Sequence, residues 1–446
     1  MQKIKRSFAA RLRNALIGVL TLSMLLLAGI YIGGTQFFSD SAALRAEILP
    51  DGTVPVGQNV PRSQSLHEKG LLPIAFGGIR YGGSSGGIYG GEAPAKALAE
   101  FAADPIHACL GAPSVLEASS AAEFATAMGS NYIFFDLLTP LPYQILYALT
   151  GEYSAPATSA DAILADRLLL SFPEKDRAVL YLSDGKVFYR AEQSFLFKAA
   201  ELQTLANDSR LSAFSLAENG VPKCEESPHA GSLTLSANCI AEESQYEALY
   251  TLFGFRANAV REEDVRTVVD PHGTLRLTGT RLVFTASKDG GIAVSDLLDT
   301  AKDELDIDLY DILDSSVSLV EKLREILPES CGGSLAPYLA GFSREEDTYT
   351  VTFGLHADSI PLSGTSYPYF ATMTIRGGRF RTVEIRFLTA QRSSYTGTQF
   401  SSAWHYAHVE KAVRPDTLRL YYYLTSLSAK DLDAAWFYTA ESEVAE

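Results

Sequence analysis

The sequence predicts an α+β protein with a single N-terminal transmembrane helix followed by two or three extracytoplasmic domains. Three observations support this prediction. Residues 15–32 form an uninterrupted apolar run. Beyond it, segments with apolar residues at helical spacing are interspersed with short runs of β-branched and aromatic residues. Turn pairs such as Asp184-Gly185 and Gly377-Gly378 join neighbouring runs, which is typical of antiparallel sheets with flanking helices.

The apolar run Ala15–Ile32 is long enough to cross a membrane. It contains no charged residue. At a rise of about 1.5 Å per residue, a helix of this length nearly spans the roughly 30 Å hydrocarbon core of a bilayer. We therefore expect a transmembrane helix over residues 15–34.

The residues before the run set its expected orientation. Five of them are basic (Lys3, Lys5, Arg6, Arg11 and Arg13), and no Asp or Glu occurs before Asp40. Basic residues next to a first span stay on the cytoplasmic side, so we expect a single-pass protein of the cell membrane with a cytoplasmic N-terminus and an extracytoplasmic bulk. A cleaved signal peptide is the alternative, although its apolar region is usually only about 7–15 residues long.

The part that follows the run is strongly acidic. Without the five basic residues of the tail, 32 Lys and Arg remain against 53 Asp and Glu, a formal charge of −21. Such a surface is repelled by nucleic acid and by anionic lipid headgroups. We therefore expect no nucleic-acid partner.

Length and composition suggest the domain organisation. The part beyond the run has room for two or three domains of roughly 100–200 residues each. We expect the following segments: a basic cytoplasmic tail (1–14), the transmembrane helix (15–34), a stalk or linker (35–70), an N-terminal α+β domain (71–210), a middle β-rich domain (211–295) and a C-terminal α+β domain (296–446).

Within these segments, apolar periodicity and turn residues predict the individual elements. In the first domain we expect a strand over 71–76, a glycine-rich loop over 77–91, helices over 94–103 and 121–128, a fully buried strand over 132–138, a helix over 143–149, a hairpin over 178–191 and a helix over 195–205. Beyond it we expect a helix over 246–255, a long helical pattern over 296–327 with a break near 306–308, strands over 348–355, 369–375 and 380–388, a helix over 404–413 and strands over 418–423 and 435–438.

The glycine-rich loop contains a weak nucleophile motif. Gly82-Gly83-Ser84-Ser85-Gly86 fits G-x-S-x-G, in which the serine of an α/β-hydrolase sits on a tight turn from strand to helix. Here the next helix does not start directly after the motif, and no regular alternation of strands and helices follows. We therefore expect a flexible surface loop, and a serine hydrolase that uses Ser84 is the weaker alternative.

No metal, cofactor or catalytic site is expected from the remaining polar residues. His405 and His408 are three residues apart but have no Cys, Asp or Glu beside them at ligand spacing. The acidic run of residues 299–314 lacks the central glycine and the final Glu of an EF-hand loop, so a solvated helix face is the expectation. Cys224 and Cys239 could pair across a hairpin, or all four cysteines could be unpaired and buried.

The overall plan resembles the YycH/YycI family of extracytoplasmic regulators from Gram-positive bacteria, in particular divergent clostridial YycH-like proteins. The resemblance lies in the basic tail, the single span and a series of segments. These are YIFFDLLTPLPYQILYAL (132–149), LYLSDGKVFYRAE (180–192), LYTLFGFRANA (249–259), the turn-rich block 270–294, ATMTIRGGRFRTVEIRF (371–387) and the terminal AAWFYT. It covers most of residues 70–440 as a pattern of elements.

The resemblance implies a regulator that is not an enzyme. Members of the family associate with WalK, the sensor histidine kinase of a cell-wall two-component system, partly through their transmembrane helices, and a paralogous regulator is a further expected partner. In this chain Gly18, Thr21, Ala28 and Gly29 fall along one side of the expected span, where small residues allow helices to pack closely. An envelope protein that is structural or binds a ligand, without a kinase partner, is the alternative.

Overall fold

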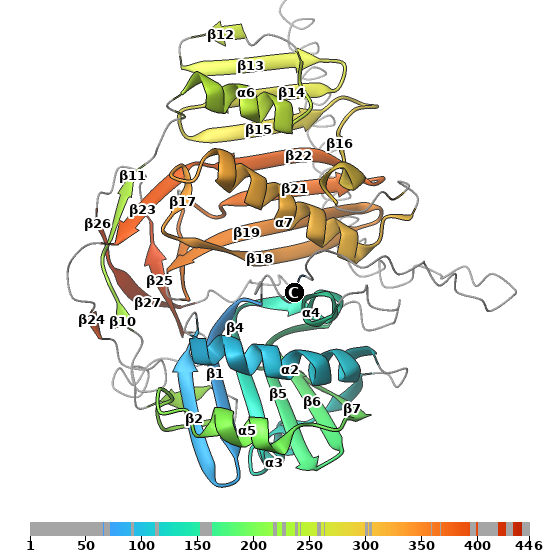
Figure 1. Ribbon diagram of the computed structural model, residues 1–446, viewed down its shortest axis with the longest axis vertical. Helices are drawn as coiled ribbons and strands as arrows, with labels where there is room; N and C mark the ends of the chain where they lie inside the picture. Colours follow the sequence, from blue (N-terminus) through green and yellow to red (C-terminus); the bar gives the residue numbers. More distant parts are fainter. Residues whose placement is uncertain are drawn as a thin grey trace, which may run out of the picture. The chain divides into compact units, whose positions relative to one another are not determined.

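The computed structural model describes residues 66, 72–90, 93–111, 116–151, 163–216, 221–224, 229–236, 240, 242–256, 260–262, 264–298, 302, 306–357, 359–365, 367–392, 398–399, 418–424 and 431–438. The chain divides into two compact units, residues 1–59 and 60–446, and every described residue belongs to the second unit. Its helices and strands are drawn in Figure 1. The described part is a mixture of helices and mainly antiparallel sheets, as the sequence predicts.

The first large element is a 7-stranded antiparallel sheet in the order β2-β1-β4-β5-β6-β7-β3. Its strands are β1 (Ile74–Tyr81), β2 (Ser84–Tyr89), β3 (Glu117–Ser119), β4 (Tyr132–Pro142), β5 (Leu164–Glu174), β6 (Arg177–Ser183) and β7 (Phe188–Ser194). The helices of this region are α2 (Ala93–Gly111), α3 (Ala121–Ala127), α4 (Tyr143–Thr150) and α5 (Ala199–Ala206).

Both faces of this sheet are covered, which explains the continuous apolar sequence of β4. Ile133 and Phe135 belong to the same core cluster as Leu98 of α2 and Leu202 of α5. The alternate residue Phe134 belongs to a second cluster that contains Phe124 of α3. Figure 1 shows α2 and α5 on one face of the sheet. The predictions of a fully buried strand here, of the helix that follows it and of the β6–β7 hairpin are confirmed.

The glycine-rich segment is a β-hairpin, so the prediction of a flexible loop was wrong. β1 and β2 pair from Phe76↔Tyr89 to Tyr81↔Ser84. Gly82 and Gly83 form the turn with φ angles of +58° and +89°, which glycine adopts without strain. Gly87 pairs with Gly78 within the sheet, and an added Cβ there would overlap the ring of Phe76. The glycines of this segment therefore provide room for packing as well as a turn.

The second large element is a 12-stranded sheet. Its main order is β12-β13-β14-β15-β22-β21-β19-β20-β25-β27, with β16 beside β22 and β18 beside β19. The strands are β12 (Val260–Glu262), β13 (Val265–Asp270), β14 (Gly273–Thr278), β15 (Arg281–Ala286), β16 (Ile292–Ala293), β18 (Ala336–Glu345), β19 (Thr348–Ala357), β20 (Ile360–Ser363), β21 (Ala371–Arg376), β22 (Arg379–Arg386), β25 (Leu418–Tyr423) and β27 (Ala434–Tyr438).

The two faces of the 12-stranded sheet differ sharply in composition. Phe284, Val383 and Met373 pair across neighbouring strands and are fully buried. Their face carries α6 (Glu243–Leu252) and α7 (Leu309–Ile326), which Figure 1 shows lying across the strands. The opposite face carries threonines in register across five strands: Thr274, Thr285, Thr382, Thr374 and Thr350. This alternation of apolar and polar residues is typical of an antiparallel sheet with one solvated face.

Smaller sheets complete the described part. A 4-stranded sheet has the order β17-β23-β11-β26, and two 2-stranded sheets pair β10 with β24 and β8 with β9. Their bounds are β8 (Phe214–Leu216), β9 (Pro222–Cys224), β10 (His229–Ala230), β11 (Leu233–Ser236), β17 (Cys331–Gly333), β23 (Leu388–Arg392), β24 (Thr398–Gln399) and β26 (Asp431–Leu432). The domain boundaries expected from the sequence stay a prediction. β15 and β22 lie on either side of position 295 and pair along five residues from Arg281↔Arg386 to Thr285↔Thr382.

The long helical pattern predicted over residues 296–327 is divided. Residues Val294–Leu297 form the 3₁₀ helix η3, and α7 starts at Leu309 after the N-cap Asp308. α7 therefore begins directly after the break predicted near 306–308, whereas residues 294–297, at the start of the predicted pattern, form a 3₁₀ helix and not an α-helix. Asp308 and Asp311 form a capping box, in which each side chain accepts a hydrogen bond from the other residue's backbone N–H.

Candidate functional site

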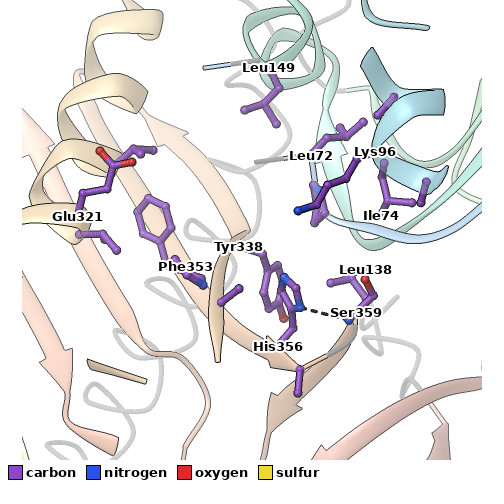
Figure 2. A pocket seen from close by; sticks show the side chains of 18 of the residues that line it. Leu72, Ile74, Lys96, Leu138, Leu149, Glu321, Tyr338, Phe353, His356 and Ser359 are labelled. Carbon is purple, nitrogen blue, oxygen red and sulfur yellow. Dashed lines mark hydrogen bonds between the residues drawn. The ribbon is translucent and has the colours of Figure 1, made fainter. Parts of the chain in front are cut away.

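Within the part of the chain that the structure describes, a cleft of about 1080 Å³ is the candidate functional site. One wall is formed by Leu72 just before β1, by Ile74 at its start and by Ala99 of α2. Across from them lie Val320 of α7 and Phe353 of β19. Figure 2 shows Leu72 and Ile74 on one side of the cleft and Phe353 on the other. The size and the apolar walls fit a ligand or a chain segment of a partner.

Charged side chains of both signs line the same cleft. Lys96 and Glu100 are four residues apart on α2, and Glu321 and Glu325 have the same spacing on α7. Figure 2 places Lys96 and Glu321 on opposite sides. Because cations and carboxylates are both present, the cleft favours an occupant that carries both donors and acceptors, such as a peptide, over a purely anionic one.

Arg324 is part of the wall and is held by the backbone. Its guanidinium donates to the carbonyl oxygen of Leu335 at 2.9 Å. Burial lowers the pKa of Arg324 from its usual value, because the charged form loses hydration. The side chain therefore fixes the end of α7 to the segment before β18.

His356 and Tyr338 form a polar group at the β18–β19 end of the cleft. The Nδ1 of His356 accepts a hydrogen bond from the backbone N–H of Ser359 at 3.2 Å, as Figure 2 shows. Acceptance at Nδ1 places the proton of the neutral ring on Nε2. The rings of Tyr338 and His356 have centroids 5.8 Å apart. Burial raises the pKa of the Tyr338 phenol, with a smaller contribution from Tyr421, so Tyr338 is a neutral hydrogen-bonding group.

Ser84 does not occupy a nucleophile turn. It is the first residue of β2, directly after the hairpin turn, and its hydroxyl donates to Oδ1 of Asn207 at 2.9 Å. The strand-to-helix geometry that exposes a hydrolase serine is therefore replaced by a strand-to-strand turn. Ser84 is also separate from the residues that line the cleft.

Several residues singled out in the sequence lie outside the described residues. These are Gly18, Thr21, Ala28 and Gly29 of the expected span, and His405 and His408. The side chains of Cys224 and Cys239 are likewise not described, whereas Cys109 and Cys331 are buried free thiols. Among the described residues no helix is long and apolar enough to cross a membrane. The transmembrane segment and the docking face stay predictions.

Burial raises the pKa of both described thiols to about 12, because the thiolate is the form that needs hydration. Cys109 also donates a hydrogen bond to the carbonyl of Ala178. Both thiols are therefore protonated at neutral pH. No cluster of three or more His, Cys, Asp or Glu side chains suited to a metal ion occurs among the described residues.

The acidic run before and within α7 is not uniformly solvated, which corrects the sequence-based expectation. Asp311 is 1 % exposed. Its carboxylate accepts a hydrogen bond from Nζ of Lys302 at 2.6 Å. Burial raises the pKa of Asp311, Asp308 adds to the rise, and Lys302 opposes it. The pattern Asp308-x-x-Asp311 just before an apolar periodic run is the capping signal that could have identified this pair in the sequence.

A second buried charged group was not anticipated. Arg167 of β5 is 1 % exposed, and its Nε lies 3.9 Å from a carboxylate oxygen of Asp136 and of Asp166. Arg167 also contacts the turn at Gly185, where an added Cβ would meet the guanidinium. The signal in the sequence was Asp166-Arg167 inside an apolar strand. The group pairs opposite charges within the sheet, away from the cleft.

Comparisons with known proteins give two structural likenesses. No protein-family model matches the chain, and no curated protein matches it. The chain is similar to YycH from Bacillus subtilis, with 13% identity and a TM-score of 0.40, over 85% of this chain and 96% of that chain. It is also similar to an uncharacterized protein from Eubacterium rectale, with 11% identity and a TM-score of 0.31, over 48% of this chain and 80% of that chain.

Proposed function

We propose that this protein is a membrane-anchored extracytoplasmic regulator that modulates a sensor histidine kinase of the WalK type by protein–protein contact. The observation that carries the proposal is the sequence of the first 40 residues. Five basic residues precede an uncharged apolar run, and an acidic region follows it. This arrangement fits a protein that is anchored in the membrane with most of its chain outside. The resemblance to the YycH/YycI family supplies the kinase as the partner.

The anchor is proposed to take part in the contact. Between helices in lipid, association depends on close packing at small residues, because lipid tails are as apolar as leucine. Gly18, Thr21, Ala28 and Gly29 fall within about a third of a turn of one another on a helix of 3.6 residues per turn. This side is therefore the proposed face for a kinase helix.

Replacing both glycines tests this face. Gly18→Leu together with Gly29→Leu adds bulk on the small side and leaves the run apolar. Each close contact in such an interface contributes about 0.5–2 kcal/mol, so we expect association with the kinase to weaken about tenfold or more. The measurement is a bacterial two-hybrid or crosslinking assay with the candidate kinase.

The matched control is Leu16→Ile with Leu27→Ile, which alters the span away from this face. Membrane fractionation shows whether all variants insert at equal levels. Unchanged association of the glycine variant at equal protein level would contradict docking through the anchor. The contact would then belong to the outer region, where the cleft is the first surface to examine.

An envelope protein that binds a ligand is the second candidate function, and the cleft favours it. Its volume of about 1080 Å³ exceeds that of most small-molecule pockets, and its walls combine Leu72 and Phe353 with Lys96 and Glu321. The two functions are compatible, since a peptide segment of a partner protein would satisfy both.

A further inference from the structure

Leu66 makes a buried contact with a residue far along the chain. It is 0 % exposed, and its backbone N–H donates to the hydroxyl oxygen of Tyr310 at 2.8 Å. Tyr310 is also 0 % exposed and lies in the first turn of α7. The two residues are 244 positions apart in the sequence. The contact therefore joins the segment that follows the expected anchor to a helix of the 12-stranded sheet.

The bond between them has a physical reason to persist. A buried backbone N–H has no water to bond with, so the loss of its acceptor shifts an equilibrium by a factor of about 5 to 100. The Tyr310 hydroxyl supplies that acceptor while its ring remains in the core. The Leu66 side chain belongs to the same core cluster, so apolar packing and one hydrogen bond hold the same residue.

The contact is made at the end of α7 that carries its cap. The neighbour of Tyr310, Asp311, is the N3 residue of the capping box with Asp308 and bonds Lys302. A cap satisfies backbone N–H groups that the first turn of a helix leaves unpaired. Movement of Tyr310 therefore acts on the part of α7 whose stability depends most on side-chain bonds.

The same helix borders the cleft. Val317, Val320 and Glu321 of α7 line it, and so does Leu72, which follows Leu66 by six positions in the sequence. α7 thus receives the Leu66 contact at its first turn and presents residues to the cleft from its following turns.

We propose that Leu66 is a clasp that ties the segment before β1 to the first turn of α7, so that its release loosens the first turns of the helix that lines the cleft from Val317 onward. The clasp deepens the proposed function and rests on it: a partner that draws the segment before β1 away from Tyr310 would loosen the start of the helix that lines the cleft. The contact itself lies within this chain and involves no partner.

Hydrogen exchange on the full-length protein in detergent micelles tests the clasp. Leu66→Asp places a charge at the buried position and should expel the residue. We expect amides of the first two turns of α7, residues 309–316, to exchange about 5- to 100-fold faster than in the parent protein, with β19 and β22 unchanged. Leu196→Asp is the matched control: this leucine is 82 % exposed, so the same substitution there should leave α7 unchanged.

Tyr310→Phe is a second variant that controls for general unfolding caused by Leu66→Asp. It removes only the acceptor oxygen and keeps the ring, so faster exchange of the same α7 amides is expected in this variant too. If Leu66→Asp also loses protection in β19 and β22, Tyr310→Phe decides the outcome. Equal exchange of residues 309–316 in the parent protein and in either Leu66→Asp or Tyr310→Phe, or an equal effect of Leu196→Asp, would overturn the clasp. None of these results depends on a kinase, so failure of the proposed function would be seen separately.

Discussion

Ser84 shows how one residue's neighbours decide between two interpretations of a motif. Its hydroxyl donates to Asn207, and its backbone lies at the start of a strand. We expect Ser84→Ala to keep the fold and to lose no hydrolytic activity, because the variant gives up one exposed hydrogen bond with a net value of about 0.5–1.5 kcal/mol. The measurement is labelling by a serine-reactive fluorophosphonate probe together with the thermal unfolding midpoint.

The control for this prediction is Ser85→Ala, a serine of the same hairpin whose hydroxyl donates to the carbonyl of Phe214. Both variants should be labelled to the same extent as the parent protein. Labelling that disappears only in Ser84→Ala would show that Ser84 is a nucleophile.

Residues that carry buried charge were the hardest to predict. Asp311 and Arg167 are each 1 % exposed, although Asp and Arg are mostly exposed in proteins. Their burial depends on partners elsewhere in the chain, Lys302 for the first and Asp136 for the second. A periodic pattern identifies the buried face of a helix or strand. It does not show which charged side chain on that face pairs with an opposite charge from elsewhere in the chain.

At the scale of elements, the β1–β2 hairpin depends on its glycines for packing. An added methyl group at Gly87 would overlap the ring of Phe76. Overpacking of this kind costs typically about 1–3 kcal/mol, so we expect Gly87→Ala to lower the urea midpoint of unfolding. The measurement is unfolding followed by circular dichroism.

Gly231→Ala is the matched control, since an added Cβ there meets no atom within 4 Å. We expect it to be nearly neutral. Equal midpoints for the two variants would contradict the packing role of Gly87.

Elements with strong local signals were predictable from the sequence, and the glycine-rich strands were not. β4 shows a continuous apolar run, and β6 and β7 flank Asp184-Gly185. The buried strand and the hairpin could therefore be predicted from local sequence. In β1 and β2 the glycines removed the β-branched signal on which strand prediction depends. Their strand character comes from pairing with β4 and from rings such as Phe214, which are contacts with distant residues.

At the scale of the whole molecule, the sequence predicted an α+β protein with antiparallel sheets but not the strand order. β15 pairs with β22, and β11 with β23, across long stretches of chain. Such pairings depend on the match between the apolar faces of two strands. The alternation of apolar and polar residues identifies the apolar face of each strand, but it does not identify the strand that pairs with it. The cleft was unpredictable for the same reason, since α2 and α7 come to line it together only through the fold.

The orientation of the whole chain in the membrane is the remaining whole-molecule prediction. Lys3, Lys5, Arg6, Arg11 and Arg13 precede the apolar run, and basic residues there resist translocation. We expect an impermeant maleimide to label Ser39→Cys in intact cells and Ser7→Cys only after lysis.

Both new cysteines are placed in a background that carries Cys224→Ser and Cys239→Ser. The two described native thiols should stay unlabelled, because burial shields them and raises their pKa to about 12. That background without either new cysteine is the control for residual labelling. Labelling of Ser7→Cys but not Ser39→Cys in intact cells would reverse the orientation and place the acidic region in the cytoplasm, where contact with an extracytoplasmic kinase surface could not occur.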